Sequence, residues 1–314
     1  MSAGQRARVS LEHEAVSDTP PAETLRFAKY EGLGNDFVVV DAAAPDAFDA
    51  SLATPATVAA ICDRHRGIGA DGVLLAGVLG GVPFMRVLNA DGSEPEMCGN
   101  GLRCVALHLA RTGRLPARPG ELVFDTGAGP HGVWLHSVGD VGLVEVQMRA
   151  PSLEPRDVPV RADTALVDAP FEVDGRVLHV TAVSMGNPHA VIFDAVDDDE
   201  RLALAPRLER DARFPEGVNV GFARMTGEEL ALRVFERGVG WTQACGTGAC
   251  AAGVAAVETG RVARDTALRV SLPGGVLVVR VGAPGARVHM TGPARHVFDG
   301  ELALASFMRA GELA

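Results

Sequence analysis

The chain has 314 residues, of which 47% are hydrophobic and 22% charged, as in ordinary globular proteins with a large core and about two domains. Its formal net charge of −11 argues against a general nucleic-acid binder, which would carry a basic excess, and against a surface attracted to anionic lipid. No uncharged apolar run reaches about 18 residues, so the sequence predicts no membrane span.

The cysteines indicate a reducing compartment. There are five, at positions 62, 98, 104, 245 and 250. An odd number in a long chain that shows no secretory signal favours free thiols and a cytoplasmic location.

Taken in chain order, the pattern is one of many short strands. Residues 1–24 are polar and aperiodic, and we expect a disordered tail there. Apolar runs separated by glycines predict strands at 37–40, 73–75, 84–88, 121–124, 133–135 and 141–148, and residues 57–63 predict a short helix. Pro151, Pro155 and Pro159 predict an irregular linker between two halves.

Further strands are predicted at 177–183, 190–193, 230–235, 268–271, 276–281 and 288–290. The acidic run at 197–200 is predicted to be a solvated loop. Because few long amphipathic helices appear, the fold class is α+β and dominated by strands.

An internal repeat organises the chain. A shift of 147 residues places Cys98-Gly99-Asn100-Gly101 on Cys245-Gly246-Thr247-Gly248. Between positions 86 and 114 the repeat keeps eight identities in 29, where unrelated segments share about two. Gly34-Asn35 is echoed by Gly186-Asn187. The repeat predicts two pseudo-symmetric domains with a ligand cleft between them.

Each repeat unit predicts a strand, a loop, Cys-Gly-x-Gly and a helix, the helices at 101–112 and 248–258. Leu102, Val105, Ala106 and Leu109 would form one apolar face of the first helix. Cys98 and Cys245 then stand just before helix N-termini, where unpaired N–H groups and the positive helix end lower a thiol pKa. The same backbone can hold a carboxylate.

Two such thiols facing one cleft suit the inversion of a carbon centre. One thiolate removes a proton, and the other thiol returns a proton to the opposite face. A single cysteine at such a place is more often a small core residue, and Cys62, Cys104 and Cys250 are predicted to be core. A Cys98–Cys245 disulfide conflicts with a reducing compartment, and the cysteine spacing lacks the paired knuckles of a zinc site, so no metal is predicted.

Polar residues near the predicted strand ends support an amino-acid site. Arg237 is suited to clamp a carboxylate, and Glu236 and His189 to adjust the pKa of a cysteine. Four asparagines occupy predicted loops beside strands: Asn35, Asn89, Asn187 and Asn219. Each alone is an ordinary turn residue, but together they indicate a zwitterionic substrate.

These residues fall in an ordered set of motifs: GLGNDF at 32–37, RGIGADG at 66–72, NADGS at 89–93, MCGNG at 97–101, MGNPH at 185–189, GVNV at 217–220, ERG at 236–238 and ACGTG at 244–248. By this set the chain resembles the diaminopimelate epimerase family from about residue 25 to 300. The resemblance implies cofactor-independent interconversion of LL- and meso-diaminopimelate, on the route to lysine and peptidoglycan, usually by a homodimer.

The resemblance also implies roles and boundaries. Cys98 and Cys245 would be the acid and base, tuned by His189 and Glu236. The reacting carboxylate would rest on Gly99, Asn100, Gly246 and Thr247. The distal end would be held by Asn35, Asn89, Asn187, Asn219 and Arg237, with Glu236 also at the substrate. Two domains, 25–150 and 151–314, would each wrap a mostly antiparallel sheet around a central helix. An alternative for the C-terminal segment from about residue 292 is that it packs in the first domain.

Two departures from the family pattern bear on the pocket. Gly72 stands where many members carry a glutamine, and Trp241 where many carry a small or acidic residue.

Three alternatives stay open at this point: a proline or hydroxyproline racemase that uses two thiols in the same way, a thiol redox sensor, and a non-catalytic amino-acid-binding protein. The asparagines and Arg237 favour a long substrate with a distal carboxylate.

Overall fold

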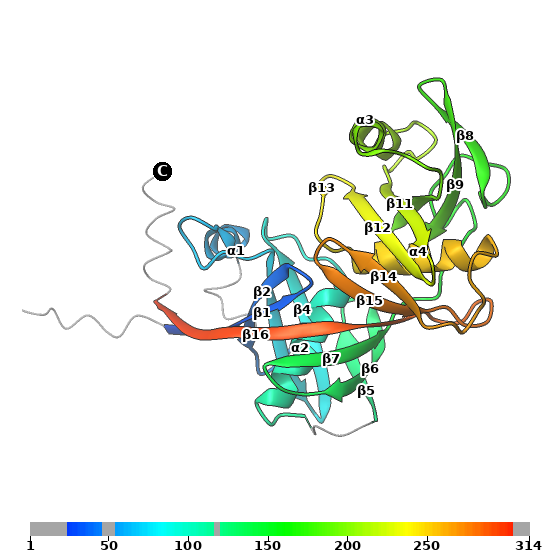
Figure 1. Ribbon diagram of the computed structural model, residues 1–314. Helices are drawn as coiled ribbons and strands as arrows, with labels where there is room; N and C mark the ends of the chain where they lie inside the picture. The colour runs from blue at the N-terminus through cyan, green and yellow to red at the C-terminus, as the bar shows by residue number, and fades with distance from the viewer. Residues whose placement is uncertain (1–23, 46–53, 116–119, 304–314) are drawn as a thin grey trace, which may run out of the picture.

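The computed structural model describes residues 24–45, 54–115 and 120–303. The predicted N-terminal tail lies outside these ranges except for Thr24, which begins the first strand. One continuous sheet runs through both halves in the order β1-β2-β3-β4-β5-β6-β7-β16-β15-β14-β12-β11-β10-β9-β8. Figure 1 shows its two halves side by side.

The sheet of the first half is closed around a helix. Its strands are β1 (Thr24–Gly32), β2 (Asn35–Asp41), β3 (Gly72–Leu79), β4 (Val82–Asn89), β5 (Glu121–Thr126), β6 (Gly129–Ser137), β7 (Val141–Gln147) and β16 (His289–Ala303). Because β16 pairs with both β7 and β1, these strands form a ring. Helix α2 (Gly99–Arg111) lies inside it, and α1 (Pro55–Cys62) lies outside (Figure 1).

The second half repeats this plan with an open sheet. It contains β8 (Ala169–Val173), β9 (Arg176–Ser184), β10 (Pro188–Ile192), β11 (Asn219–Thr226), β12 (Glu229–Glu236), β13 (Gly240–Trp241), β14 (Leu268–Leu272) and β15 (Gly275–Arg280). Its helices are α3 (Asp198–Glu209) and α4 (Gly246–Glu258). Strand β15 pairs with the start of β16, so this one strand joins the two halves.

The sequence repeat is a structural repeat. Strands β4 and β12 begin at 82 and 229, helices α2 and α4 at 99 and 246, and strands β5 and β14 at 121 and 268. Each pair is offset by the same 147 residues. In both halves the helix connects two parallel neighbours in the sheet, β4 with β5 and β12 with β14. The α+β prediction with two pseudo-symmetric domains, each with a central helix, is confirmed.

The predicted local structure needs three corrections. Strands β1, β8 and β11 are not among the predicted strands, although β3, the repeat partner of β11, is. The acidic run at 197–200 is not a loop: Asp197 caps α3, and Glu200 completes a reciprocal capping box with it. Carboxylates in a first turn are favoured by the positive helix end, so this run starts a helix.

The third correction concerns α2. Sequence periodicity predicted one apolar face, but every residue from Gly99 to Ala110 is buried, including Arg103 and His108. The ring of strands surrounds the helix on all sides, and a helix buried on all sides need not be amphipathic.

Candidate active site

The two repeated cysteines are the N-cap residues of α2 and α4. Cys98 has an extended backbone, and its sulfur accepts the N–H of Gly101 at 3.3 Å. Cys245 does the same with the N–H of Gly248 at 3.4 Å. Each sulfur thus takes the place of a serine oxygen in an ordinary N-cap. The prediction that both cysteines stand at helix N-termini is confirmed.

The two cysteine loops meet between the halves. A methyl group added to Gly246 would lie 3.5 Å from the side-chain oxygen of Asn100, which belongs to the opposite loop. The side chain of Met290, on the shared strand β16, lies against both Gly99 and Gly246. The carboxylate of Glu236 acts on the pKa of both Cys98 and Cys245. The repeat therefore brings the two thiols into one site.

The prediction of lowered thiol pKa values is wrong. Burial raises the pKa of both Cys98 and Cys245, and the Glu236 carboxylate raises both further. The N–H groups at the helix ends do lower both values, but desolvation of the thiolate outweighs them. Both cysteines are therefore thiols at neutral pH.

Glu236 is in direct contact with Cys245. It is the last residue of strand β12, and its carboxylate accepts a hydrogen bond from the Cys245 thiol and another from the Thr242 hydroxyl at 2.6 Å. Burial raises the pKa of Glu236, so its carboxylate is a stronger base than one in water. The structure brings this predicted tuning residue to the sulfur that it was expected to affect.

His189 reaches Cys245 only through two other side chains. Its Nε2 lies 3.1 Å from the Asn187 oxygen, and the Asn187 amide donates to the Thr247 hydroxyl at 3.3 Å. That hydroxyl lies 3.6 Å from the Cys245 sulfur and lowers its pKa. Burial lowers the pKa of His189 to about 3, so the imidazole is neutral. Because the Asn187 nitrogen donates to Thr247, the Asn187 oxygen faces His189. The imidazole of His189 therefore carries its proton on Nε2, which donates to that oxygen.

The first half presents a matching set of amides. Asn35 donates to the carboxylate of Asp71 at 2.5 Å, and Asn100 donates to the Asn35 oxygen at 3.3 Å. The Asn100 oxygen accepts from the guanidinium of Arg103 at 2.9 Å. Sequence reasoning missed Asp71 and Arg103. Asp71 lies in the RGIGADG motif, which was quoted without a role, and the repeat gave no signal for Arg103, because it matches Cys250.

The remaining predicted substrate contacts lie farther along the strand ends. The Asn219 side chain donates to the Pro188 carbonyl at 2.8 Å and accepts the backbone N–H of Arg237 at 3.0 Å. Arg237 is exposed, and its guanidinium donates to the Glu216 carbonyl at 2.8 Å. Asn89, at the end of β4, is exposed and donates to Ser93 at 2.9 Å.

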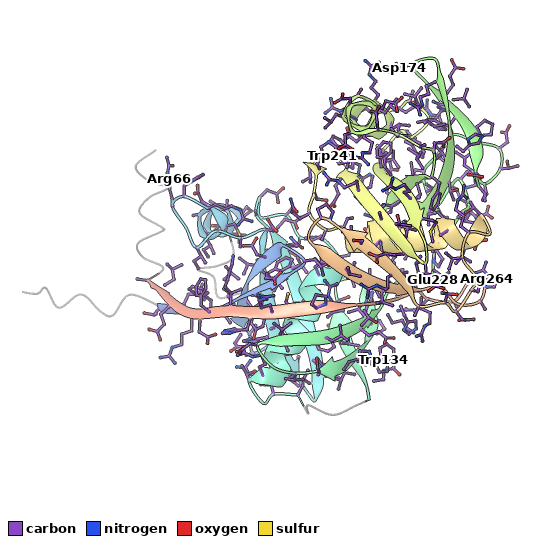
Figure 2. The ribbon with its side chains drawn as sticks, viewed as in Figure 1. Arg66, Trp134, Asp174, Glu228, Trp241 and Arg264 are labelled. Carbon is purple, nitrogen blue, oxygen red and sulfur yellow. The ribbon has the colours of Figure 1, made fainter. Side chains whose placement is uncertain are left out.

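The two departures from the family pattern have structural explanations. Trp241 is partly buried and packs on Phe222 and Phe235 against the core of the second half, and Figure 2 labels it at the edge of that half. Gly72 pairs with Asn89 in register, and a methyl group there would lie 2.4 Å from the Leu88 carbonyl oxygen. A side chain at 72 would require the backbone to move.

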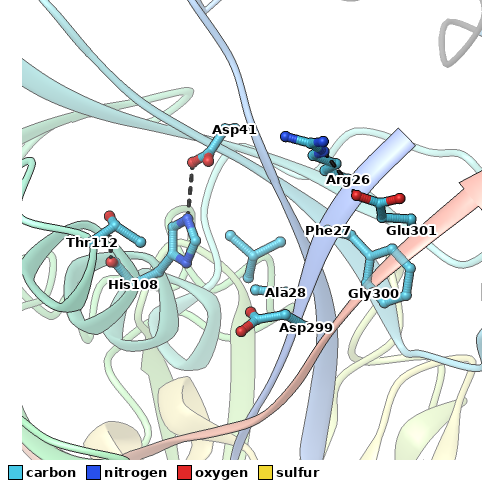
Figure 3. Close-up of a pocket in the computed structure, with 10 residues that line it drawn as sticks. Arg26, Phe27, Ala28, Asp41, His108, Thr112, Asp299, Gly300 and Glu301 are labelled. Carbon is cyan, nitrogen blue, oxygen red and sulfur yellow. Dashed lines mark hydrogen bonds and ion pairs between the residues drawn. The ribbon is translucent and has the colours of Figure 1, made fainter. Parts of the chain in front are cut away.

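A hollow of about 490 Å³ lies elsewhere, at the C-terminal end of α2. Figure 3 shows His108 and Asp41 bonded to one another there, opposite Asp299. None of the predicted site residues lines it.

Over the described ranges, no three His, Cys, Asp or Glu side chains converge as metal ligands, and no helix is long and apolar enough to cross a membrane.

Comparison with known proteins decides the family. The sequence model of the diaminopimelate epimerase family matches residues 27–153 and 181–297. The chain belongs to the diaminopimelate epimerase family. It is therefore an isomerase, and the resemblance seen in the motifs is confirmed.

Relatives of known name agree with this family over most of the chain. The diaminopimelate epimerase of Alkalilimnicola ehrlichii is 45% identical over 290 residues, which cover 89% of this chain and 99% of that protein. That of Desulforudis audaxviator is 46% identical over 283 residues, covering 88% and 99%. The chloroplastic enzyme of Oryza sativa subsp. japonica is 42% identical, covering 88% of this chain and 79% of that protein.

Solved structures show that the fold extends beyond diaminopimelate epimerases. A hydroxyproline epimerase from Agrobacterium vitis superimposes with a TM-score of 0.62 at 16% identity, over 90% of this chain and 93% of that one. A phenazine biosynthesis protein of the PhzF family from Bacillus anthracis gives 0.63 at 15% identity, over 89% and 99%. At these identities the likeness shows the shared two-domain architecture.

Proposed function

We propose that this diaminopimelate epimerase interconverts LL- and meso-2,6-diaminopimelate, in the supply of lysine and peptidoglycan precursors, with Cys98 and Cys245 as its two acid/base groups. The observation that carries the proposal is that the two sulfurs cap equivalent helices of the two halves, whose loops meet. Two acid/base groups related by a pseudo-two-fold axis suit a substrate carbon that must be approached from both faces.

The proton transfers balance as follows. The Glu236 carboxylate takes the proton of the Cys245 thiol to which it is hydrogen-bonded. The resulting thiolate removes the α-proton of the substrate and becomes a thiol again. The Cys98 thiol gives its proton to the opposite face of the α-carbon and is left as a thiolate. After product leaves, Glu236 releases its proton to solvent and Cys98 takes one up, which restores the starting state. In the reverse direction the two cysteines exchange roles.

The carboxylate at the reacting carbon would rest between the two helix N-termini. Gly99, Asn100, Gly246 and Thr247 occupy the first turns of α2 and α4, where N–H groups point outward without helical partners. Both positive helix ends would stabilise the charge that develops on this carboxylate when the α-proton leaves. Removal of the proton then becomes feasible without an electron-withdrawing cofactor.

The distal amino-acid end would be held by Asn35, Asn89, Asn187, Asn219 and Arg237. Arg237 is exposed beside the amides of the second half and lies near enough to act on the pKa of His189. A guanidinium matches a carboxylate in bidentate geometry. This feature favours a substrate with a second carboxylate over proline or hydroxyproline, which have none.

The proposal extends to the setting of the enzyme. All five cysteines are free, in keeping with a reducing cytoplasm. We place the division between domains near residue 150, with the segment from about 292 returning to the first domain, in keeping with the pairing of β16 with β1. A homodimer is the proposed assembly, and light scattering of the purified protein tests it.

The activity is tested by proton exchange in deuterated water. The reduced protein, with no added cofactor, is incubated with LL-diaminopimelate, and the α-proton signal is followed by NMR together with chiral analysis. Loss of the signal with appearance of the meso form is the expected result. Exchange of proline or hydroxyproline instead would move the assignment to those racemases, and no exchange with any of them would contradict catalysis.

A further inference from the structure

The side chain of Arg103, on α2, is a cation buried against the shared strand β16. Its side chain is fully inaccessible, and over the described ranges no carboxylate lies within salt-bridge distance of it. Its guanidinium donates to the Asn100 oxygen at 2.9 Å and to the Pro293 carbonyl of β16 at 3.2 Å. Burying such a charge costs free energy, so we expect the Arg103 side chain to have a role that offsets this cost.

The fold is built to hold this guanidinium in one place. A methyl group on Gly32 would lie 3.2 Å from it on one side, and a methyl group on Gly292 would lie 3.2 Å from it on another. The position that matches Arg103 in the repeat is Cys250, a small buried residue within reach of the Arg103 charge. The two positions that the repeat relates are therefore different: α2 carries an arginine at 103, and α4 carries a cysteine at 250.

Arg103 is one end of a hydrogen-bonded chain whose other end is Asp71. A guanidinium can only donate, and an ionised carboxylate can only accept. The two amides between them, Asn100 and Asn35, must therefore point their oxygens toward Arg103 and their nitrogens toward Asp71. Flipping either amide would place two donors or two acceptors face to face. The charges at the two ends leave only one orientation for both.

We propose that Arg103 and Asp71 are positioning residues that together lock Asn35 and Asn100 in the orientation that binds substrate. Each amide nitrogen carries a second N–H beyond the one used in the chain, and these hydrogens are then presented to the anionic groups of the substrate. The inference rests on the proposed function, because it assigns these two asparagines to the substrate of that site.

The buried charge has a second consequence, at Cys98. Two charged side chains act on that thiol from the elements around it: Arg103 of α2 lowers its pKa, and Glu236 at the end of β12 raises it. Glu236 raises the pKa of Cys245 as well, but there the opposing side chain is the hydroxyl of Thr247 rather than Arg103. Arg103 therefore favours the Cys98 thiolate, which is the form left after Cys98 has given up its proton.

The test compares Arg103→Lys, Arg103→Met and Asp71→Asn with the wild-type enzyme. Arg103→Met and Asp71→Asn should each raise KM for diaminopimelate by about five- to tenfold, the effect of one misdirected hydrogen bond. Arg103→Lys, whose ammonium group also only donates, should raise KM less than Arg103→Met. The pH midpoint of Cys98 alkylation by iodoacetamide, read by mass spectrometry without substrate, should rise by about one pH unit in Arg103→Met. It should stay at the wild-type value in Arg103→Lys, which keeps the charge, and in Asp71→Asn.

Two controls separate this role from a purely structural one. Arg111→Met removes another arginine of α2, bonded to Tyr30 and Asp140, and should leave KM and the alkylation midpoint unchanged. Arg64→Met removes the ion pair of Asp71 but leaves its bond to Asn35. If Arg64→Met raised KM as much as Asp71→Asn, the orienting role of Asp71 would be overturned.

Other outcomes are equally decisive. An unchanged KM in folded Arg103→Met and Asp71→Asn would overturn the proposal. An unshifted Cys98 midpoint in Arg103→Met would overturn the electrostatic part. Since alkylation needs no substrate, it tests Arg103 even if the wild-type enzyme failed to exchange the α-proton of diaminopimelate, a result that would count against the proposed function alone.

Discussion

The sulfurs of Cys98 and Cys245 accept the N–H three residues further along their own helices, at 3.3 and 3.4 Å, in two halves related by 147 residues. A thiol at this place both caps a helix and faces the site. Loss of either sulfur therefore has two separable consequences, one for stability and one for chemistry.

Replacing either cysteine by alanine should abolish epimerisation. Because each thiol serves as the only acid or base on its face, kcat should fall by at least about 10³-fold. The same change removes a cap and should lower the free energy of unfolding by about 1 kcal/mol. Chiral analysis of product and urea denaturation measure the two effects.

Serine separates the two effects. Cys98→Ser and Cys245→Ser keep an atom that accepts the capping N–H, so stability should return to the wild-type value while activity stays low. Cys62→Ala is the control, because it removes a buried thiol of α1 that lies outside the site. The Cys62→Ala enzyme should remain active. Full turnover in Cys98→Ala or Cys245→Ala would rule out the two-base mechanism.

Glu236→Gln should separate acidity from activity. Since the Glu236 charge raises the pKa of Cys245, its removal should make that thiol more acidic, moving the alkylation midpoint of Cys245 to lower pH. Turnover should nevertheless fall by about 100-fold, because the proton acceptor is gone. Glu229→Gln, at the other end of β12, should change neither. A higher Cys245 midpoint in Glu236→Gln would contradict this account.

His189 should make the protein sensitive to acid. Burial lowers its pKa from 6.5 to about 3, so between these values the unfolded chain binds a proton that the folded protein does not. Its contribution to stability is complete above pH 6.5 and is lost as pH falls toward 3, by about 1.4 kcal/mol per pH unit. Urea unfolding of His189→Gln between pH 4.5 and 6 should show a slope of stability against pH that is smaller by that amount. Identical slopes would mean that burial does not lower the pKa of His189 in the folded protein.

Arg237→Ala should mainly weaken binding of a substrate that has a distal carboxylate. Loss of a charged hydrogen bond predicts an increase in KM of about tenfold or more, with a smaller change in kcat. Arg233→Ala removes an exposed arginine of β12, the strand that ends just before Arg237, and should leave KM unchanged. If KM and kcat both kept their wild-type values in Arg237→Ala, Arg237 would have no place in the site.

Much of this protein could be predicted from its sequence, because the deciding signals are local. The repeat marks equivalent helices, glycines mark the ends of strands, and the cysteines precede the helices directly, so the two N-caps follow from neighbours in the chain. The ordered motifs identify the family for the same reason. Strand β11 could have been found from its repeat partner β3.

Only the tertiary structure decided the properties that depend on surroundings. The closed ring of strands buries α2 on every side, so the apolar face predicted for it has no solvent-exposed opposite. Desolvation within the assembled site raises the pKa of both thiols, whereas helix ends considered alone predicted the reverse. His189 is linked to Cys245 through Asn187 and Thr247, and Arg103 contacts Asn100 and β16. These contacts and the dielectric environment arise only when distant segments pack together.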